Sequence, residues 1–154
     1  MPTDYFSAYP SQVAALVAEC ASWNGTPFRA RSAIKGAGGG VDCAGYVGAV
    51  FFAIGAIPAP VSVPPYDLNH AEHSEESTLR AWLESPEARR HVRRVDEEEA
   101  HLDGDMVFPI VGRSEHHLGL RVGPLVYHVA RPSGPCTMTL SQLRLHRSRY
   151  RLLA

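Results

Sequence analysis

Apolar residues recur at helical spacing near the start of the chain, between residues 10 and 23. Four of them fall at positions i, i+3, i+4 and i+7, which places them on one helix face: Val13, Leu16, Val17 and Cys20. Ser11 stands where an N-cap residue is expected. The pattern predicts an amphipathic helix with Cys20 on the side that packs into the core.

A second and more apolar helix is predicted from Asp42 to Gly55, after a glycine-rich loop over residues 25–40. Asp42 can cap the first turn, and Gly55 can end the helix in a left-handed conformation. Ala49 and Phe52 make its second side apolar as well, so we expect deep burial. Its principal face carries Cys43, Val47, Val50, Phe51 and Ile54.

The middle of the chain is less regular. Four prolines between residues 58 and 65 indicate an irregular or extended segment. Residues 74–84 have the spacing of a short amphipathic helix, with Leu79, Trp82 and Leu83 on its apolar side, and a further turn is expected after Pro86.

The last third of the chain has the pattern of strands. Alternating or strand-forming residues occupy 106–108, 117–122, 125–130 and 143–153, and the last run alternates Leu or Tyr with Arg. Gly123-Pro124 indicates a hairpin turn. Helices followed by an antiparallel sheet predict an α+β fold.

Composition limits the classes of function. The 154 residues correspond to one domain, and 45% hydrophobic with 20% charged residues is typical of a folded protein. A net charge of −1 gives no field that would recruit nucleic acid, and no run reaches the roughly 18 apolar residues of a membrane span. The first ten residues contain no Lys or Arg, so we expect cytoplasmic synthesis without a signal peptide.

Cys43 is the first candidate for chemistry. It would open the predicted buried helix, where unpaired backbone N–H groups and the helix dipole stabilise a thiolate. A thiol normally has a pKa of about 8.5, and a helix N-terminus or a nearby histidine lowers it. The alternative interpretation of Cys43 is that it acts only as a small apolar side chain packed in the core.

Two histidines favour the catalytic alternative. With a turn at Gly123-Pro124, His117 and His128 come nearly opposite each other on one face of a hairpin. Gly119 leaves space beside His117. A cysteine at a helix N-terminus with two adjacent histidines is the layout of nucleophile, base and orienting group.

The residues that carry this chemistry also resemble a known family, the NlpC/P60 cysteine peptidases. Four segments resemble its motifs and follow in its order: WNGTPF at 23–28 with VDCAGYV at 41–47, DGDMVF at 103–108, HLGLRVG at 117–123, and VYHVA at 126–130. The resemblance implies one papain-like domain over residues 1–154, with an insert at about 58–94.

The resemblance further implies the roles of the site residues. Cys43 would be the nucleophile, His117 the general base and His128 the orienting residue, and the Cys43 backbone N–H would contribute to an oxyanion hole. The substrate would be the stem peptide of peptidoglycan, commonly cut between D-glutamate and the diamino acid. No metal or organic cofactor is implied.

Two positions depart from the family's pattern on the substrate side. Ala44 stands where a serine is usual, and Phe28 stands where a tyrosine is common. Both changes remove a hydroxyl from the substrate side, so the sequence leaves open which peptide bond is cut. The candidate substrate contacts are Asp42, Phe28, Ala44 and His116, although alternation places His116 on the opposite strand face, at the surface.

The insert and the bare single domain resemble phage and prophage relatives associated with tail assembly, so the site of action is expected at a virion tail or the periplasmic wall, with tail proteins as candidate partners. Two other functions stay open, a non-catalytic tail or wall-binding module and an acyltransferase. His70, His73 and Asp67 are interpreted as a solvated loop, since no further ligand completes a metal set. Cys20 and Cys136 are interpreted as cysteines without a catalytic role.

The arginines of the C-terminal half have two interpretations. Arg89 to Arg94 are expected to pair with Asp96 to Glu99 on a solvated surface. Four more could contact an anionic wall polymer or a partner: Arg144, Arg147, Arg149 and Arg151.

Overall fold

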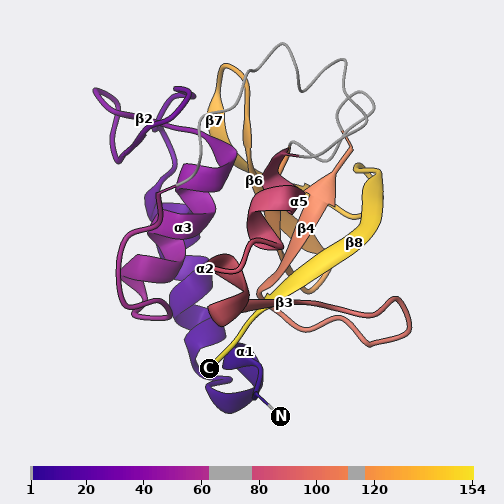
Figure 1. Ribbon diagram of the computed structural model, residues 1–154. Coiled ribbons are helices and arrows are strands. Elements are labelled where there is room, and N and C mark those ends of the chain that lie inside the picture. The colour runs from indigo at the N-terminus through magenta and orange to yellow at the C-terminus, as the bar shows by residue number, and fades with distance from the viewer. Residues whose placement is uncertain (1, 63–77, 111–116) are drawn as a thin grey trace.

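A six-stranded antiparallel sheet forms one layer of the protein, and the N-terminal helices pack beside it (Figure 1). The computed structural model describes residues 2–62, 78–110 and 117–154. The strand order is β3-β8-β4-β5-β6-β7, and α3 packs on β5 and β6 while α2 packs on α3. The sheet strands are β3 (Val92–Arg94), β4 (Asp105–Pro109), β5 (Gly119–Val122), β6 (Leu125–Ala130), β7 (Gly134–Thr139) and β8 (Leu145–Leu152).

The remaining elements precede this sheet along the chain. They are α1 (Tyr5–Ala8), α2 (Gln12–Ser22), the paired short strands β1 (Ala33–Ile34) and β2 (Gly40–Val41), α3 (Cys43–Ala53), α5 (Thr78–Leu83) and the 3-10 turn η1 (Ala88–Arg90). The predicted α+β class is therefore confirmed, and the turn expected after Pro86 is η1. The two-stranded β1-β2 ribbon within the glycine-rich loop was not anticipated.

The predicted boundaries of α3 are confirmed. The Asp42 side chain accepts a hydrogen bond of 2.7 Å from the Gly45 N–H, and Gly55, at φ +76°, follows the last turn. The face that contains Cys43 is buried, as expected, but Phe52 on the other side is 44% exposed. The expectation of burial on both sides was therefore wrong for Phe52.

The helix α2 joins the core through the face that its spacing indicates. Leu16 and Cys20 are buried, and the Tyr46 hydroxyl of α3 donates to the Cys20 carbonyl at 3.3 Å. Ser11 occupies the N-cap position, but its side chain makes no capping hydrogen bond. Its backbone already has helical angles. The predicted position of the N-cap is therefore confirmed, but the predicted capping by the Ser11 side chain is wrong.

The β5–β6 hairpin turns at Gly123-Pro124, as predicted, because Val122 pairs with Leu125. The ladder continues with Leu120 opposite Tyr127. This register puts Gly119, and not His117, opposite His128, so the two histidines are diagonal neighbours on one face. The expectation that they lie nearly opposite was wrong by two residues along the strand.

Two buried arginines on β8 correct another expectation. Arg149 and Arg151 are each 5% exposed, so neither is available to an anionic polymer. Both donate to the fully buried Asp105 carboxylate on β4, Arg149 at 3.1 Å and Arg151 at 2.6 and 2.9 Å. A buried charge is tolerated only when it is paired in this way. The Gly-Asp element of the sequence therefore acts here as an anchor for β8.

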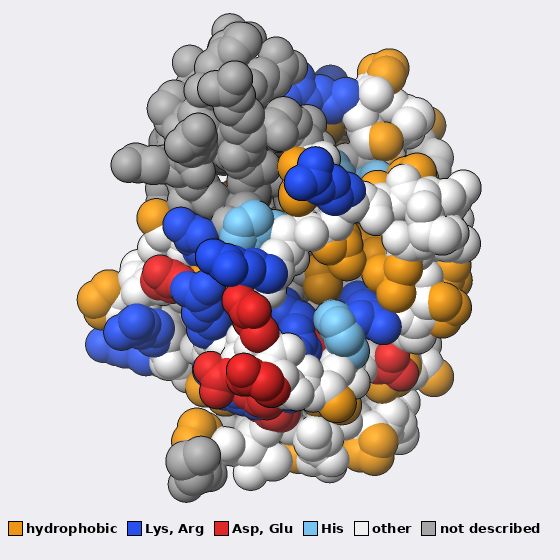
Figure 2. Space-filling view, turned by 90° about the vertical axis from the view of Figure 1, so that its right-hand side faces the viewer, with side chains coloured by type: hydrophobic (Ala, Val, Ile, Leu, Met, Phe, Trp, Pro, Cys, Tyr) orange, Lys and Arg blue, Asp and Glu red, His pale blue; other side chains and the backbone are white. Residues whose placement is uncertain are grey.

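Acidic and basic side chains lie next to each other on one face of the molecule (Figure 2). Arg93 makes ion pairs with both Asp4 and Glu99, and Arg94 pairs with Glu84. Self-pairing of the 89–94 and 96–99 charges is thus confirmed for Arg93. The Arg93 pairs are part-buried and bidentate, whereas the Arg94–Glu84 pair is exposed, and an exposed pair contributes little to stability, about 0–1 kcal/mol.

The segment between α3 and β3 is only partly described. Residues 58–62 are irregular, as expected, and the last residues of the predicted insert form β3, which pairs with β8 at the edge of the sheet. Four residues named above lie outside the described residues: Asp67, His70, His73 and His116. In the part of the chain that is described, no helix is long and apolar enough to cross a membrane.

Candidate active site

His117 and His128 form a direct hydrogen bond. Nε2 of His117 lies 2.7 Å from Nδ1 of His128, and the two rings meet edge to face with centroids 4.9 Å apart. His128 is held on β6 and is 4% exposed, while His117 stands two residues before β5. Gly119 lies opposite His128, where β5 and β6 pack closely: a Cβ at Gly119 would lie 2.9 Å from Val126 Cγ1 and 3.1 Å from the Tyr127 carbonyl oxygen.

The surroundings of the pair keep both rings neutral near pH 7. Burial, together with the neighbouring His128 and Arg131, lowers the pKa of His117 to about 4. Burial also lowers the pKa of His128. A neutral imidazole has one N–H and one lone pair, so one ring donates to the other. Because Nε2 of His117 is engaged, Nδ1 is the nitrogen left for proton transfer to or from a substrate.

Cys43 is the first residue of α3 and is 5% exposed. Its position beside the capped helix N-terminus is the one that the sequence predicts, where backbone N–H groups favour negative charge on sulfur or on a nearby oxygen. The α3 helix begins at the end of the molecule where β6 passes into β7 (Figure 1). Ala44 and Leu118, the chain neighbours of Cys43 and His117, line one common cavity.

The loop that contains Phe28 connects these two parts of the site. Phe28 forms a bridge with Val41, two residues before Cys43, and its N–H donates to the Pro132 carbonyl at 3.2 Å. The Arg131 guanidinium lies over the Phe28 ring, 5.2 Å from its centre. Phe28 thus packs between the start of α3 and the β6–β7 connection. Its predicted contact with substrate stays a prediction.

Both carboxylate oxygens of Asp42 bind the chain's own backbone. Oδ1 accepts from the Gly45 N–H and Oδ2 accepts from the Arg31 N–H, each at 2.7 Å, and the residue is 3% exposed. These bonds hold the loop against the start of α3 and so position Cys43. They give Asp42 a structural role that requires no substrate. The predicted contact of Asp42 with substrate stays a prediction.

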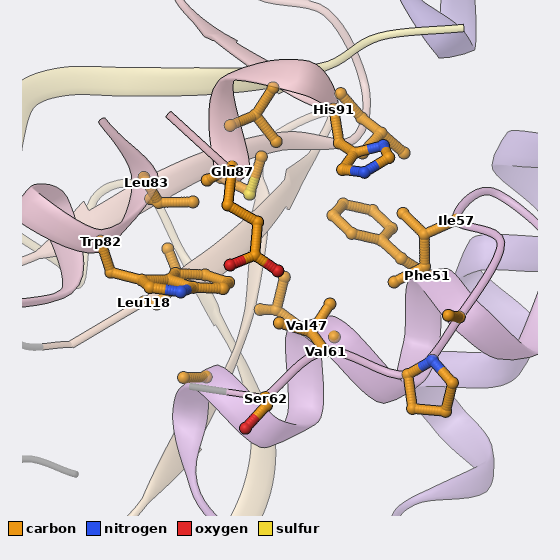
Figure 3. A pocket seen from close by; sticks show the side chains of 18 of the residues that line it. Val47, Phe51, Ile57, Val61, Ser62, Trp82, Leu83, Glu87, His91 and Leu118 are labelled. Atoms are coloured by element: carbon orange, nitrogen blue, oxygen red, sulfur yellow. The ribbon is translucent and has the colours of Figure 1, made fainter. Parts of the chain in front are cut away.

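An apolar cavity of about 250 Å³ extends along α3 (Figure 3). Its lining includes Ala44, which follows Cys43 in the chain and is 4% exposed, Phe51 further along α3, and Ile57, which comes after the helix. Trp82 closes the opposite wall, and the Glu87 carboxylate points toward the space. Among the described residues, no group of three His, Cys, Asp or Glu side chains is arranged to hold a metal ion.

The other two cysteines differ sharply in their surroundings. Cys20 is 1% exposed, and burial raises the pKa of its thiol to about 11, which agrees with its interpretation as a core residue. Cys136 was interpreted as a cysteine without a catalytic role, but its Sγ lies 3.5 Å from Nε2 of His128. A second hairpin after β6 would place Cys136, eight residues after His128, on the neighbouring strand. The sequence did not predict that strand, because Gly134 and Pro135 are unfavourable in strands.

Comparison of the chain with protein-family models finds no match, and comparison with curated proteins finds none either. The geometry of the site therefore carries the functional argument.

Proposed function

We propose that this chain is a thiol-dependent hydrolase of the papain-like NlpC/P60 type, with Cys43, His117 and His128 as its triad, acting on amide bonds of peptidoglycan stem peptides. The observation that carries the proposal is the 2.7 Å hydrogen bond between the two imidazoles, one on β6 and one just before β5, the two strands that pack against the helix that begins at Cys43. Packing of the core does not require two buried histidines to be hydrogen-bonded to each other. A general base and the group that orients it do require such a bond.

The chemical steps follow from which atoms are engaged. Cys43 Sγ attacks the amide carbonyl carbon while Nδ1 of His117 takes the thiol proton, and His128 holds the ring through Nε2. The first-turn N–H groups of α3 stabilise the oxyanion. His117 then gives the proton to the leaving amine, the C–N bond breaks, and a thioester remains on Cys43. Water, deprotonated by His117, releases the acid and restores the thiol.

The substrate class rests on the resemblance of the motifs, and the missing hydroxyls at Ala44 and Phe28 leave the scissile bond to experiment. The test is incubation with defined stem peptides, followed by mass spectrometry of the products. Hydrolysis adds the mass of one water across the cut bond, and a transferase instead joins the acyl part to an added amine. His101→Ala, an exposed histidine outside the site, is the matched control for His117→Ala.

The second candidate function is a wall-binding or tail module that keeps the fold without turnover, which the absence of both hydroxyls favours. Binding of intact peptidoglycan without any product, unchanged in Cys43→Ala, would support it over the hydrolase. Cleavage by the wild-type protein that disappears in Cys43→Ala and persists in His101→Ala would exclude it.

A further inference from the structure

The histidine pair continues into a third side chain on β7. Cys136 is the cross-strand partner of His128 in the β6–β7 ladder, and its Sγ lies 3.5 Å from Nε2 of His128. Nδ1 of the same ring contacts Nε2 of His117 at 2.7 Å. Both nitrogens of His128 are therefore engaged, and the three side chains form one hydrogen-bonded row.

Such a row has two directions, and they differ in what His117 can do. In the first, Nε2–H of His117 donates to Nδ1 of His128, and Nε2–H of His128 donates to Sγ of Cys136. In the second, the Cys136 thiol donates to His128, His128 donates through Nδ1, and the proton of His117 sits on its own Nδ1. Only the first direction leaves a lone pair on Nδ1 of His117, where a general base needs it.

Burial raises the pKa of the Cys136 thiol, so the sulfur is protonated near pH 7, and a neutral thiol can either accept or donate a hydrogen bond. The proposed function requires the first direction, because only then does His117 keep a lone pair on Nδ1.

We propose that Cys136 is a positioning residue: by accepting the Nε2–H of His128 it selects the tautomer in which His117 is a base. The inference rests on the proposed function, since it concerns the role of His117. Cys136 touches no reacting atom and acts through His128. A wrong tautomer at the orienting position is costly in triad enzymes, so a modest sulfur contact has a measurable effect on turnover.

The test compares Cys136→Ala and Cys136→Ser with the wild type, using nitrogen-15 spectra of the two imidazoles and kcat and KM on stem peptides. We expect the Nε2–H tautomer of His117 in the wild type and a mixture of tautomers in Cys136→Ala, with kcat about tenfold lower and KM unchanged. Cys136→Ser should restore both, because a hydroxyl oxygen accepts. Thr137→Ala, exposed on the same strand, is the control.

Two results would overturn the inference. One is an unchanged His117 tautomer in Cys136→Ala, and the other is faster iodoacetamide labelling of Cys136 than of Cys43 with turnover lost only in the Cys136 variants, which would make Cys136 the nucleophile. The spectra need no substrate, so absence of turnover in the wild type would remove the proposed function while the tautomer still decides the role of Cys136. If Cys136→Ala does not fold, loss of the wild-type tautomer in Cys136→Ser contradicts the inference.

Discussion

Nε2 of His117 and Nδ1 of His128 lie 2.7 Å apart, across a hairpin in which they are not opposite partners. Gly119 occupies the position opposite His128, and a side chain there would press against Val126 and the Tyr127 carbonyl. The close spacing of β5 and β6 beside the two histidines therefore requires a residue without a Cβ at this position. The proposed base and its proposed orienting group are thereby in direct contact.

Replacing His128 by Gln should impair catalysis and move its pH profile. Loss of the orienting ring lowers kcat about 100-fold. His128 lowers the pKa of His117, so its removal raises that pKa from about 4. Since the base must be unprotonated, the acidic limb of kcat/KM moves to higher pH. The measurement is kcat/KM between pH 4 and 8, and an acidic limb that stays in place would contradict the assigned contact.

Burial of His117 should make stability depend on pH. An imidazole in the unfolded chain titrates near pH 6.5, whereas the folded environment lowers the pKa of His117 to about 4. Between these values the unfolded chain binds the extra proton, so the free energy of unfolding decreases as pH falls from about 6.5 to 4, by up to about 3 kcal/mol. Above pH 6.5 the contribution is complete.

Urea unfolding at pH 7.0 and 4.5 measures this effect. His117→Gln should lose less stability on acidification than the wild type, because its side chain does not titrate. Equal losses in the two proteins would show that His117 is not the buried titrating group. His128 adds an effect of the same sign, so the variant retains part of the slope.

Asp105→Asn should destabilise the fold without touching the site. Arg149 and Arg151 are both buried against this carboxylate, and removal of its charge leaves them uncompensated. Breaking a buried pair costs about 3–5 kcal/mol in the free energy of unfolding. Glu97→Gln is the control, since its exposed pair with Arg147 contributes less than about 1 kcal/mol. Equal unfolding midpoints for the two variants would contradict the anchoring role of Asp105.

Gly119→Ala should separate activity from stability. A Cβ at this position would lie 2.9 Å from Val126 Cγ1 and 3.1 Å from the Tyr127 carbonyl oxygen, so the strands must shift beside the histidines. We expect about 1–3 kcal/mol of destabilisation from overpacking. We also expect at least about a tenfold loss of kcat, because small misplacements of catalytic groups are costly.

The matched control is Gly38→Ala, where a Cβ would meet no atom within 4 Å. It should leave both kcat and the unfolding midpoint near the wild-type values. A Gly119→Ala protein with wild-type kcat would show that the spacing of the two strands does not set the histidine contact.

Local signals predicted much of this fold. Asp42 and Gly55 mark the two ends of α3, and Gly123-Pro124 marks the hairpin, because capping and turn chemistry act over a few residues. The strand β7 was missed because Gly134 and Pro135 are poor strand residues, and only pairing with β6 accommodates them there.

The parts of the site that were missed depend on contacts between distant segments. Arg151 is buried because Asp4 and Asp105 lie beside it, and Asp4 is 147 residues away in the chain. Cys136 meets His128 only through the β6–β7 register. Spacing within one strand showed which residues share a face, but not which neighbouring strand would cover that face.

The most direct test of the central claim needs no substrate. The wild-type protein and His117→Ala are treated with limiting iodoacetamide from pH 5 to 9, and labelling of Cys20, Cys43 and Cys136 is quantified separately by mass spectrometry. The triad predicts that Cys43 reacts fastest at neutral pH and slows in His117→Ala, while the buried Cys20 stays unlabelled. Labelling of Cys43 no faster than that of Cys20, or unchanged by His117→Ala, would contradict the proposed active site.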